Sequence, residues 1–277
     1  MKSHFTLGRG AAIACAVSSA TTMLTGVCSG QIAADYAIFP TYDSGWSAGQ
    51  NGGFGFTAWS FGGTSGSAVQ QGMNSTSPFN QLGRAWTLYN PAGSPAGTDL
   101  AQAGRGFAPL AVGQTFETVI DSPSERTFYR GYTIRLGSGA DNTATERFAA
   151  YTFEYFSYGK WYTGNGSGNH ATSLFDTDTA AAGMRLDFTL TGTDTYHLSL
   201  TPLSNPAKVY SEDGTLKASG PVDYVLFQLY GNQSDPTKAT DFYISGMTIL
   251  PAAIPEPSSL ALIGLGSAGL LFLRRRK

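Results

Sequence analysis

A strict alternation of apolar and polar side chains over residues 186–190, repeated over 196–200, most constrains the fold of this chain. The apolar positions of its two halves are Leu186, Phe188 and Leu190, then Tyr196, Leu198 and Leu200. A period of two places every second side chain on the same face of a strand. The residues between the halves, 191–194, read Thr-Gly-Thr-Asp and favour a turn. The pattern therefore predicts an antiparallel hairpin with one buried and one solvated face.

The same period continues towards the C-terminus. Residues 225–229 repeat it, with apolar side chains at every second position. In residues 241–250 the phase changes, because Phe242 and Ile244 are even-numbered and Met247 and Ile249 are odd-numbered. A β-bulge at Ser245-Gly246 would absorb the extra residue and keep both pairs inward.

Further strands are predicted at residues 85–89, 114–120, 127–136 and 148–158, and loops at 90–106 and 164–169. Residues 36–72 contain short aromatic runs between Asn-Gly, Gly-Gly and Ser-Gly turn signals. Helical periodicity is absent outside the two ends. About twelve short strands in one domain predict an all-β fold, a two-sheet antiparallel sandwich or jelly roll.

The last 23 residues, Pro255 to Lys277, consist of three parts in a fixed order. Pro255-Glu256-Pro257 disfavours helix, residues 258–273 carry no charge, and the chain closes on a basic run formed by Arg274, Arg275, Arg276 and Lys277. As a helix, the apolar part would span ~24 Å, slightly less than the ~30 Å hydrocarbon core. Terminal basic side chains can snorkel to the interface, and they stay on the cytoplasmic side. A short C-terminal transmembrane helix is expected.

This order of parts resembles the PEP-CTERM sorting signal of bacterial surface proteins. The resemblance covers residues 255–277 and implies recognition by an exosortase, a membrane enzyme thought to cut near the Pro-Glu-Pro motif. The same tail closes some proteins labelled ice-binding. An ordinary C-terminal membrane anchor is the alternative.

The N-terminus has the pattern of a secretory signal peptide, residues 1–30, with a basic start at Lys2 and Arg9 and an apolar helix from Ala11 to Val27. Cleavage is expected after Gly30 or Ala34. Both cysteines, Cys15 and Cys28, lie in this segment, so residues 31–254 contain neither a disulfide nor a cysteine metal site.

Residues 31–254 form the expected ectodomain of about 220 residues. It holds 11 basic and 18 acidic residues, a net charge of about −7. No basic run is present to neutralise phosphates, so nucleic acid is not expected as a partner. The run AAAGMRLDFTLTGTDTYHLSLTP, with DFYISGMTIL before the tail, resembles the lectin-like (concanavalin A-type) jelly-roll domains of PEP-CTERM proteins.

Catalytic chemistry is poorly represented in the ectodomain. Only two histidines, His170 and His197, remain, and neither a G-x-S-x-G elbow nor a metal-ligand histidine spacing appears. Glycosidases on this fold need paired carboxylates, and the Glu-x-Asp-x-x-Glu motif of the laminarinase-like hydrolases is missing. Glu117, Asp121 and Glu154 are too loosely placed to replace it. We therefore expect no enzyme and no catalytic residues.

Two binding sites are considered. Tyr158, Trp161, Tyr162 and Asn165 bring aromatic rings beside amides, which suits stacking on sugar rings; burial of these rings is the alternative. Asp176 and Asp178 offer oxygen ligands for a structural calcium ion, although turn residues without a metal are the simpler interpretation. No other cofactor is expected.

The sequence thus predicts an exported protein that passes the secretion machinery and signal peptidase. It would be held in the inner membrane by its C-terminal helix, and processed by an exosortase to the cell surface or extracellular matrix. The ectodomain is expected to be non-catalytic and a candidate for polysaccharide binding. A glycan hydrolase or lyase is the first alternative, and an ice-binding protein is the second, although no Thr-x-Thr ladder is visible.

Overall fold

The computed structural model describes residues 31–63, 70–75, 82–90, 99–121, 130–139, 144–153, 159–175, 177–178, 182–231 and 240–252. Within them the chain forms fifteen strands and one short 3₁₀ helix, η1 (Pro40–Tyr42). The strands are β1 (Ala33–Tyr36), β2 (Ser60–Gly63), β3 (Gln70–Asn74), β4 (Ala85–Asn90), β5 (Asp99–Gly106), β6 (Thr115–Asp121), β7 (Arg130–Ser138), β8 (Thr145–Phe153), β9 (Lys160–Asn165), β10 (Gly168–Phe175), β11 (Met184–Leu190), β12 (Thr195–Pro202), β13 (Tyr210–Thr215), β14 (Tyr224–Gly231) and β15 (Thr240–Leu250).

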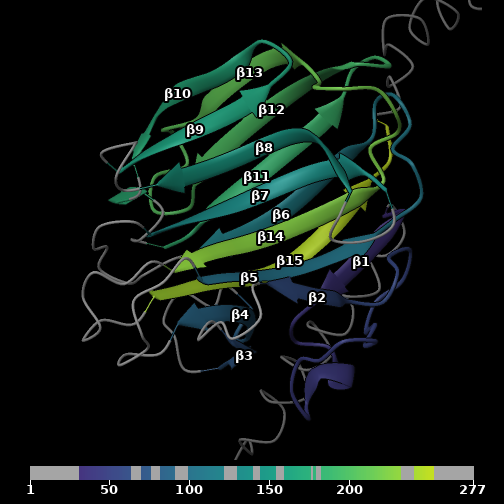
Figure 1. The fold of residues 1–277 in the computed structure, drawn as a ribbon, viewed down its shortest axis with the longest axis vertical. Coiled ribbons are helices and arrows are strands. Elements are labelled where there is room, and N and C mark those ends of the chain that lie inside the picture. The colour runs from purple at the N-terminus through teal and green to yellow at the C-terminus, as the bar shows by residue number, and fades with distance from the viewer. Residues whose placement is uncertain are drawn as a thin grey trace, which may run out of the picture.

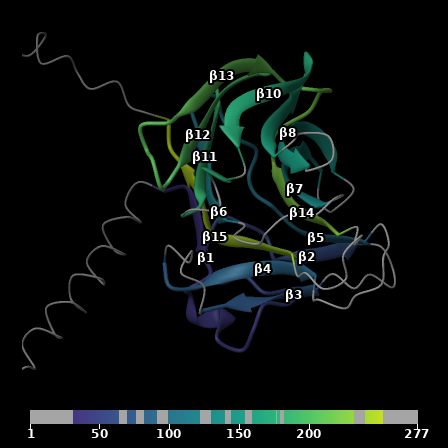
Figure 2. The same cartoon turned by 90° about the vertical axis from the view of Figure 1, so that its left-hand side faces the viewer.

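The strands form two antiparallel sheets that pack face to face (Figures 1 and 2). One sheet has eight strands in the order β13-β12-β11-β6-β15-β4-β3, with β1 paired to β15. The other has seven strands in the order β10-β9-β8-β7-β14-β5-β2. The prediction of an all-β two-sheet antiparallel sandwich is confirmed.

The hairpin and the bulge appear where the apolar periodicity predicts them. β11 pairs with β12 so that Leu186 faces Leu200 and Leu190 faces Tyr196, and all the apolar side chains of this pair lie in the core. The pairing of β15 with β6 shifts by one residue between Ile244 and Gly246. Because of that shift, Ile244 and Met247 both remain buried on the same face of the sheet.

The interpretation of residues 90–106 as a loop is wrong for its second half, because β5 is an inner strand of the seven-stranded sheet. Its inward side chains are Ala101, Ala103 and Arg105. Two alanines and an arginine give no hydrophobic period to recognise. Small side chains suit this position because Trp59 and Phe227, whose ring centroids are 6.4 Å apart, occupy the space between the sheets.

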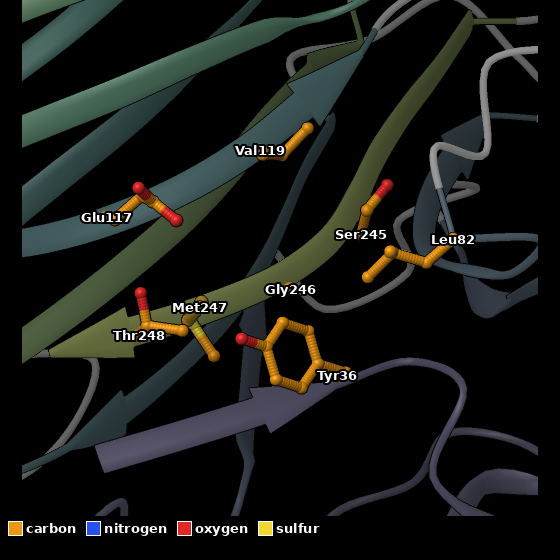
Figure 3. Close-up of a pocket in the computed structure, with 8 residues that line it drawn as sticks. All are labelled: Tyr36, Leu82, Glu117, Val119, Ser245, Gly246, Met247 and Thr248. Atoms are coloured by element: carbon orange, nitrogen blue, oxygen red, sulfur yellow. The ribbon is translucent and has the colours of Figure 1, made fainter. Parts of the chain in front are cut away.

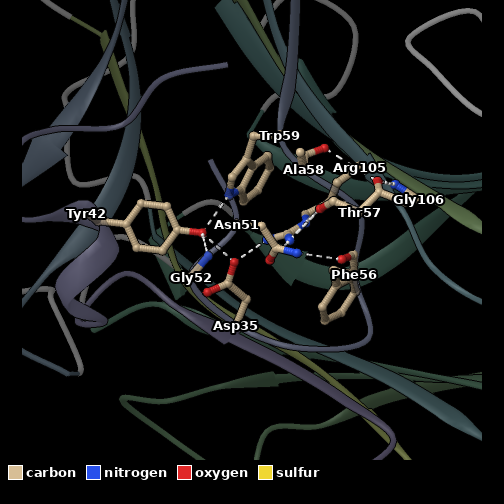
Figure 4. A network of polar contacts seen from close by, with 10 residues as sticks. All are labelled: Asp35, Tyr42, Asn51, Gly52, Phe56, Thr57, Ala58, Trp59, Arg105 and Gly106. Atoms are coloured by element: carbon tan, nitrogen blue, oxygen red, sulfur yellow. Dashed lines mark hydrogen bonds and ion pairs between the residues drawn. The ribbon is translucent and has the colours of Figure 1, made fainter. Parts of the chain in front are cut away.

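A buried polar network fastens the N-terminal segment to β5 (Figure 4). The side chains of Asp35 and Arg105 are fully buried and form an ion pair. The Tyr42 hydroxyl donates to Asp35 at 2.5 Å and accepts from the indole of Trp59 at 3.2 Å. The guanidinium of Arg105 also lies over the Trp59 ring, 4.8 Å from its centroid. Burial raises the pKa of Asp35, while Arg105 and Tyr42 act against that rise.

A second network closes the sandwich at the opposite edge, between β9 and the pair β12–β13. Glu212 accepts hydrogen bonds from Tyr196 (2.6 Å), Tyr210 (2.6 Å) and Thr163 (3.0 Å). Burial, followed by the bond to Glu212, raises the pKa of Tyr210 to about 12. Buried polar groups satisfied in this way fix how the two sheets face each other.

The expected signal helix at residues 1–30 and the C-terminal helix at 258–273 lie outside the described residues. Among the residues that the structure does describe, no helix has the length and apolar character needed to cross a membrane.

Candidate functional site

The outer face of the seven-stranded sheet carries a continuous row of polar and aromatic side chains. β5, β14, β7, β8 and β9 pair in register so that the outward residues lie side by side across the sheet. In order, the row is Gln102, Gln228, Thr133, Tyr151 and Tyr162. On the inner face of the same strands lie core residues such as Ile134, Phe148 and Phe227. The alternation thus places core side chains on the inner face of the sheet and polar and aromatic side chains on its outer face.

Two tyrosines form an aromatic platform within this row. Tyr151 on β8 and Tyr162 on β9 are direct cross-strand partners. Their rings stack, with centroids 5.8 Å apart and planes inclined by 18°. Both side chains are half-buried, so the pair keeps exposed surface on the outer side of the sheet. Stacked tyrosines provide a flat apolar surface with hydroxyls at the rim, which suits a pyranose ring.

A guanidinium, a phenol and an amide converge beside this platform. The Nη2 of Arg135 donates to the hydroxyl of Tyr230 at 3.2 Å. That hydroxyl in turn donates to Oε1 of Gln228, also at 3.2 Å. Tyr230 and Arg135 lie on opposite sides of the row, and their side chains meet above Gln228 and Thr133. These two central side chains are consequently only 1% and 3% exposed.

An ionic cluster that includes the same Arg135 guanidinium also lies beside the platform. Glu146 pairs through one carboxylate oxygen with Arg135 at 3.0 Å and through the other with Lys217 at 2.7 Å. Lys217 comes from the segment after β13 and reaches over Gly164. A Cβ on Gly164 would lie 3.1 Å from Nζ of Lys217, 3.1 Å from Oδ1 of Asn169 and 3.6 Å from the Tyr151 ring. The glycine therefore leaves the space in which these three groups meet.

Two tyrosines of this face, Tyr151 and Tyr230, have raised pKa values. Burial raises the pKa of Tyr151, and the neighbouring Tyr162 and Glu146 raise it further. Burial also raises the pKa of Tyr230, with Arg135 acting in the opposite direction. A phenol with a raised pKa keeps its proton at neutral pH, so it can donate a hydrogen bond but provides little of the phenolate that a general base requires.

Three of the four residues expected to bind glycan are described by the structure, and they do not lie on the same face. Tyr162 lies on the outer face, as part of the platform. Trp161 is fully buried and packs edge-on against Tyr132, with centroids 5.2 Å apart. Asn165 is 6% exposed and donates to the Tyr196 hydroxyl at 2.7 Å. Tyr158 lies outside the described residues.

Sequence reasoning missed most of the outer-face cluster. Arg135, Glu146, Lys217 and Tyr230 lie far apart in the chain, and their spacing carries no motif. Two of them had a positional signal. Arg135 alternates with core residues on the predicted strand 127–136, and Tyr230 directly follows the predicted strand 225–229, so a period of two places both side chains on the outward face. The loop expected at 164–169 is also wrong, because β9 and β10 form a hairpin there with Gly166 and Ser167 at its tip.

The outer face of the eight-stranded sheet has a small pocket of about 180 Å³ beside Tyr36 and Thr248 (Figure 3). Glu117 lines it and is the cross-strand partner of Asp187. Burial raises the pKa of Glu117, and Asp187 raises it further.

The expected calcium ligands are not assembled in the described residues. Asp176 lies outside them, and both carboxylate oxygens of Asp178 accept from Lys208 at 2.7 Å. No group of three or more His, Cys, Asp or Glu side chains in this part of the chain could hold a metal ion. His170 is exposed on β10, and His197 contacts Asp213 at 2.8 Å on the solvated face of β12.

Comparison with known proteins identifies one segment. Residues 253–277 match the PEP-CTERM protein-sorting motif. The resemblance stated for the tail is thereby confirmed, and the motif indicates an exported protein that is processed at a membrane. No curated protein sequence matches the chain.

The fold is similar to several solved structures at low sequence identity. The exoplasmic/lumenal domain of VIP36 in its Ca²⁺-bound form is 9% identical over 72% of this chain and 85% of that one, with a TM-score of 0.40. The carbohydrate recognition domain of Emp47p is 11% identical over 70% and 89%, with a TM-score of 0.41. The endo-β-1,4-glucuronan lyase of Trichoderma reesei is 10% identical over 79% and 95%, with a TM-score of 0.44.

Proposed function

We propose that this is an exported protein, processed by an exosortase, whose β-sandwich binds a polysaccharide on the outer face of the seven-stranded sheet without cleaving it. The observation that carries the proposal is the Tyr151–Tyr162 platform with hydrogen-bonding groups on both sides. Sugar-binding sites commonly combine an aromatic face with a few fixed polar groups. Here the half-buried Tyr230 and the exposed Asn169 supply the polar groups.

A lyase is the second candidate, and one observation favours it. Arg135, Tyr230 and Gln228 form a convergent set beside the platform, and β-elimination of a uronate needs a base near a group that neutralises the carboxylate. The raised pKa of Tyr230 opposes this role, because abstraction of the proton requires the phenolate. Non-catalytic binding is therefore the better-supported proposal.

Binding is tested by affinity electrophoresis of the purified full chain through gels that contain a panel of plant and bacterial polysaccharides. Replacing Tyr162 with Ala removes half of the platform and should abolish retardation by the polymer that is bound. Tyr36→Ala is the matched control, since Tyr36 is a half-buried tyrosine on the outer face of the other sheet. Equal retardation of Tyr162→Ala and the native chain would place the site elsewhere. Formation of unsaturated ends, followed by ultraviolet absorbance, would instead establish a lyase.

Sorting is tested by the mass of the mature protein recovered from its host. Processing at the tail predicts a mass that ends near residue 257, and replacing Pro255, Glu256 and Pro257 with alanine should prevent it. A mass that runs to Lys277 in both forms would mean a plain membrane anchor. The surface or matrix location would then be wrong.

A further inference from the structure

The outer face of the seven-stranded sheet has a charge opposite to that of the domain around it. Beside the platform, Arg135 and Lys217 share the single carboxylate of Glu146, and the Lys160 ammonium lies over the Phe175 ring, 5.4 Å from its centroid. Residues 31–254 as a whole carry a net charge of about −7. A local surplus of positive charge within an acidic domain is the electrostatic arrangement that attracts an anionic ligand.

Glu146 cannot neutralise this surplus. Its two carboxylate oxygens are divided between Arg135 and Lys217, so one negative charge serves two positive ones. The three side chains are 35%, 25% and 33% exposed for Arg135, Glu146 and Lys217 respectively, so both cations are accessible to a ligand. In the described part of the chain, nothing accepts a hydrogen bond from Nη1 of Arg135, whose Nη2 is held by Tyr230. A planar guanidinium with a donor to spare is well suited to a carboxylate.

The cations lie next to the aromatic platform. The position above Gly164 is bordered by both the Lys217 ammonium and the ring of Tyr151. Thr133 on β7 is the cross-strand partner of Tyr151 on β8. Arg135 lies two residues after Thr133 on the same face of β7, where its cross-strand partner is Ala149. A ring stacked on the tyrosines would therefore carry a substituent within reach of both cations.

From this arrangement we propose that the ligand is an anionic polysaccharide with carboxylate-bearing sugars. Its pyranose rings stack on Tyr151 and Tyr162, and its carboxylates are bound by Arg135 and Lys217. The inference rests on the proposed function, because it names the chemical class of the polysaccharide bound at that site. Exposed cations are screened by salt, so binding should weaken as the ionic strength rises.

The test measures dissociation constants of the full chain in detergent micelles by titration calorimetry. The probes are polygalacturonate, the neutral glucan dextran, and single-stranded DNA as a polyanion without sugar carboxylates. The variants are Lys217→Gln, the double variant Arg135→Gln/Lys217→Gln, and Tyr162→Ala. Arg185→Gln is the matched control, because Arg185 is an exposed cation on the outer face of the other sheet, paired with Asp187 at 2.9 Å. Thermal unfolding of each variant verifies that it is folded. If the double variant does not fold, the single variant Lys217→Gln replaces it, because the Lys217 side chain is partly exposed.

Polygalacturonate should bind at least tenfold more tightly than dextran or DNA. The double variant should lose at least about tenfold in affinity, equivalent to about 1.4 kcal/mol, whereas Arg185→Gln should stay within about twofold. Equal affinity for dextran, with an unaffected double variant but a weakened Tyr162→Ala, would overturn the inference and leave polysaccharide binding in place. DNA bound as tightly as polygalacturonate would also overturn it. Absence of binding to both polysaccharides would refute the inference and count against the proposed function itself.

Discussion

Removing the negative charge of Asp35 should destabilise the sandwich more than any comparable surface change. In Asp35→Asn the buried Arg105 loses its ion-pair partner, and both side chains are fully buried. Breaking a buried pair from one side costs about 3 to 5 kcal/mol. Arg105 keeps its bonds to the Thr57 carbonyl and to Asn51, so the lower half of that range is expected.

The measurement is thermal unfolding of residues 31–252. For a domain of this size, 1 kcal/mol shifts Tm by about 2 to 4 °C, so a loss of about 3 to 4 kcal/mol should lower the midpoint by about 6 to 16 °C. Asp43→Asn is the matched control, because Asp43 forms an ion pair with Arg84 at 2.5 Å and its side chain is 69% exposed. Exposed pairs contribute at most about 1 kcal/mol, so this Tm should change by less than about 4 °C.

The double variant Asp35→Asn/Arg105→Met separates the charge effect from lost packing. If the penalty arises from an unpaired buried guanidinium, removing the guanidinium should recover part of it, and the two single losses should not add. Equal Tm values for Asp35→Asn and Asp43→Asn would refute the reasoning. Strict additivity in the double variant would show that the two side chains act independently.

Three further outcomes are expected. Burial, and then the charge of Asp187, raises the pKa of Glu117 in the folded state. The stability that is present below the unfolded-state pKa is therefore lost as the pH rises through the folded-state pKa. Glu117→Gln should raise Tm near neutral pH and leave it unchanged near pH 4, and a lower Tm at neutral pH would contradict this. Gly53→Ala places a Cβ 1.9 Å from the carbonyl oxygen of Ala34 and should cost more than about 2 kcal/mol in urea unfolding, whereas Gly106→Ala, with its nearest contact at 3.4 Å, should cost much less; equal losses would show that the backbone relaxes. Tyr196→Phe removes the hydrogen bond that Asn165 donates to Tyr196 and one of the three that Glu212 accepts, and it should cost about 1 to 3 kcal/mol, a prediction that an unchanged Tm would contradict.

The fold class was predictable because apolar and polar residues alternate along several strands that form the core. Residues 186–190 and 196–200 alternate between apolar and polar side chains, and these two runs form the β11–β12 hairpin. The phase change around Ser245 predicted the bulge in β15 for the same reason, since a slip of one residue would turn every following side chain outward. β5 was missed because two of its three inward residues are alanines, so its sequence lacks the alternation of large apolar residues that predicts a strand.

The candidate site was only partly predictable. Trp161 and Tyr162 are consecutive, so in a strand one must face the core and the other the solvent. The sequence does not say which, because that depends on the register with β8, where Tyr151 pairs with Tyr162. The partners Arg135, Glu146, Lys217 and Tyr230 come from four separate segments.

By itself, the sequence determined the sandwich and the sorting tail, because both follow from local patterns. The sandwich follows from the alternation of apolar and polar residues along the strands, and the tail from an ordered motif within 23 residues. Tertiary structure alone decided which tyrosines form the platform, which arginine is buried with Asp35, and which remains accessible beside Glu146. Those outcomes depend on strand order and register between distant segments. The free energies that set them come from burying side chains across two sheets, and no local stretch of sequence contains that information.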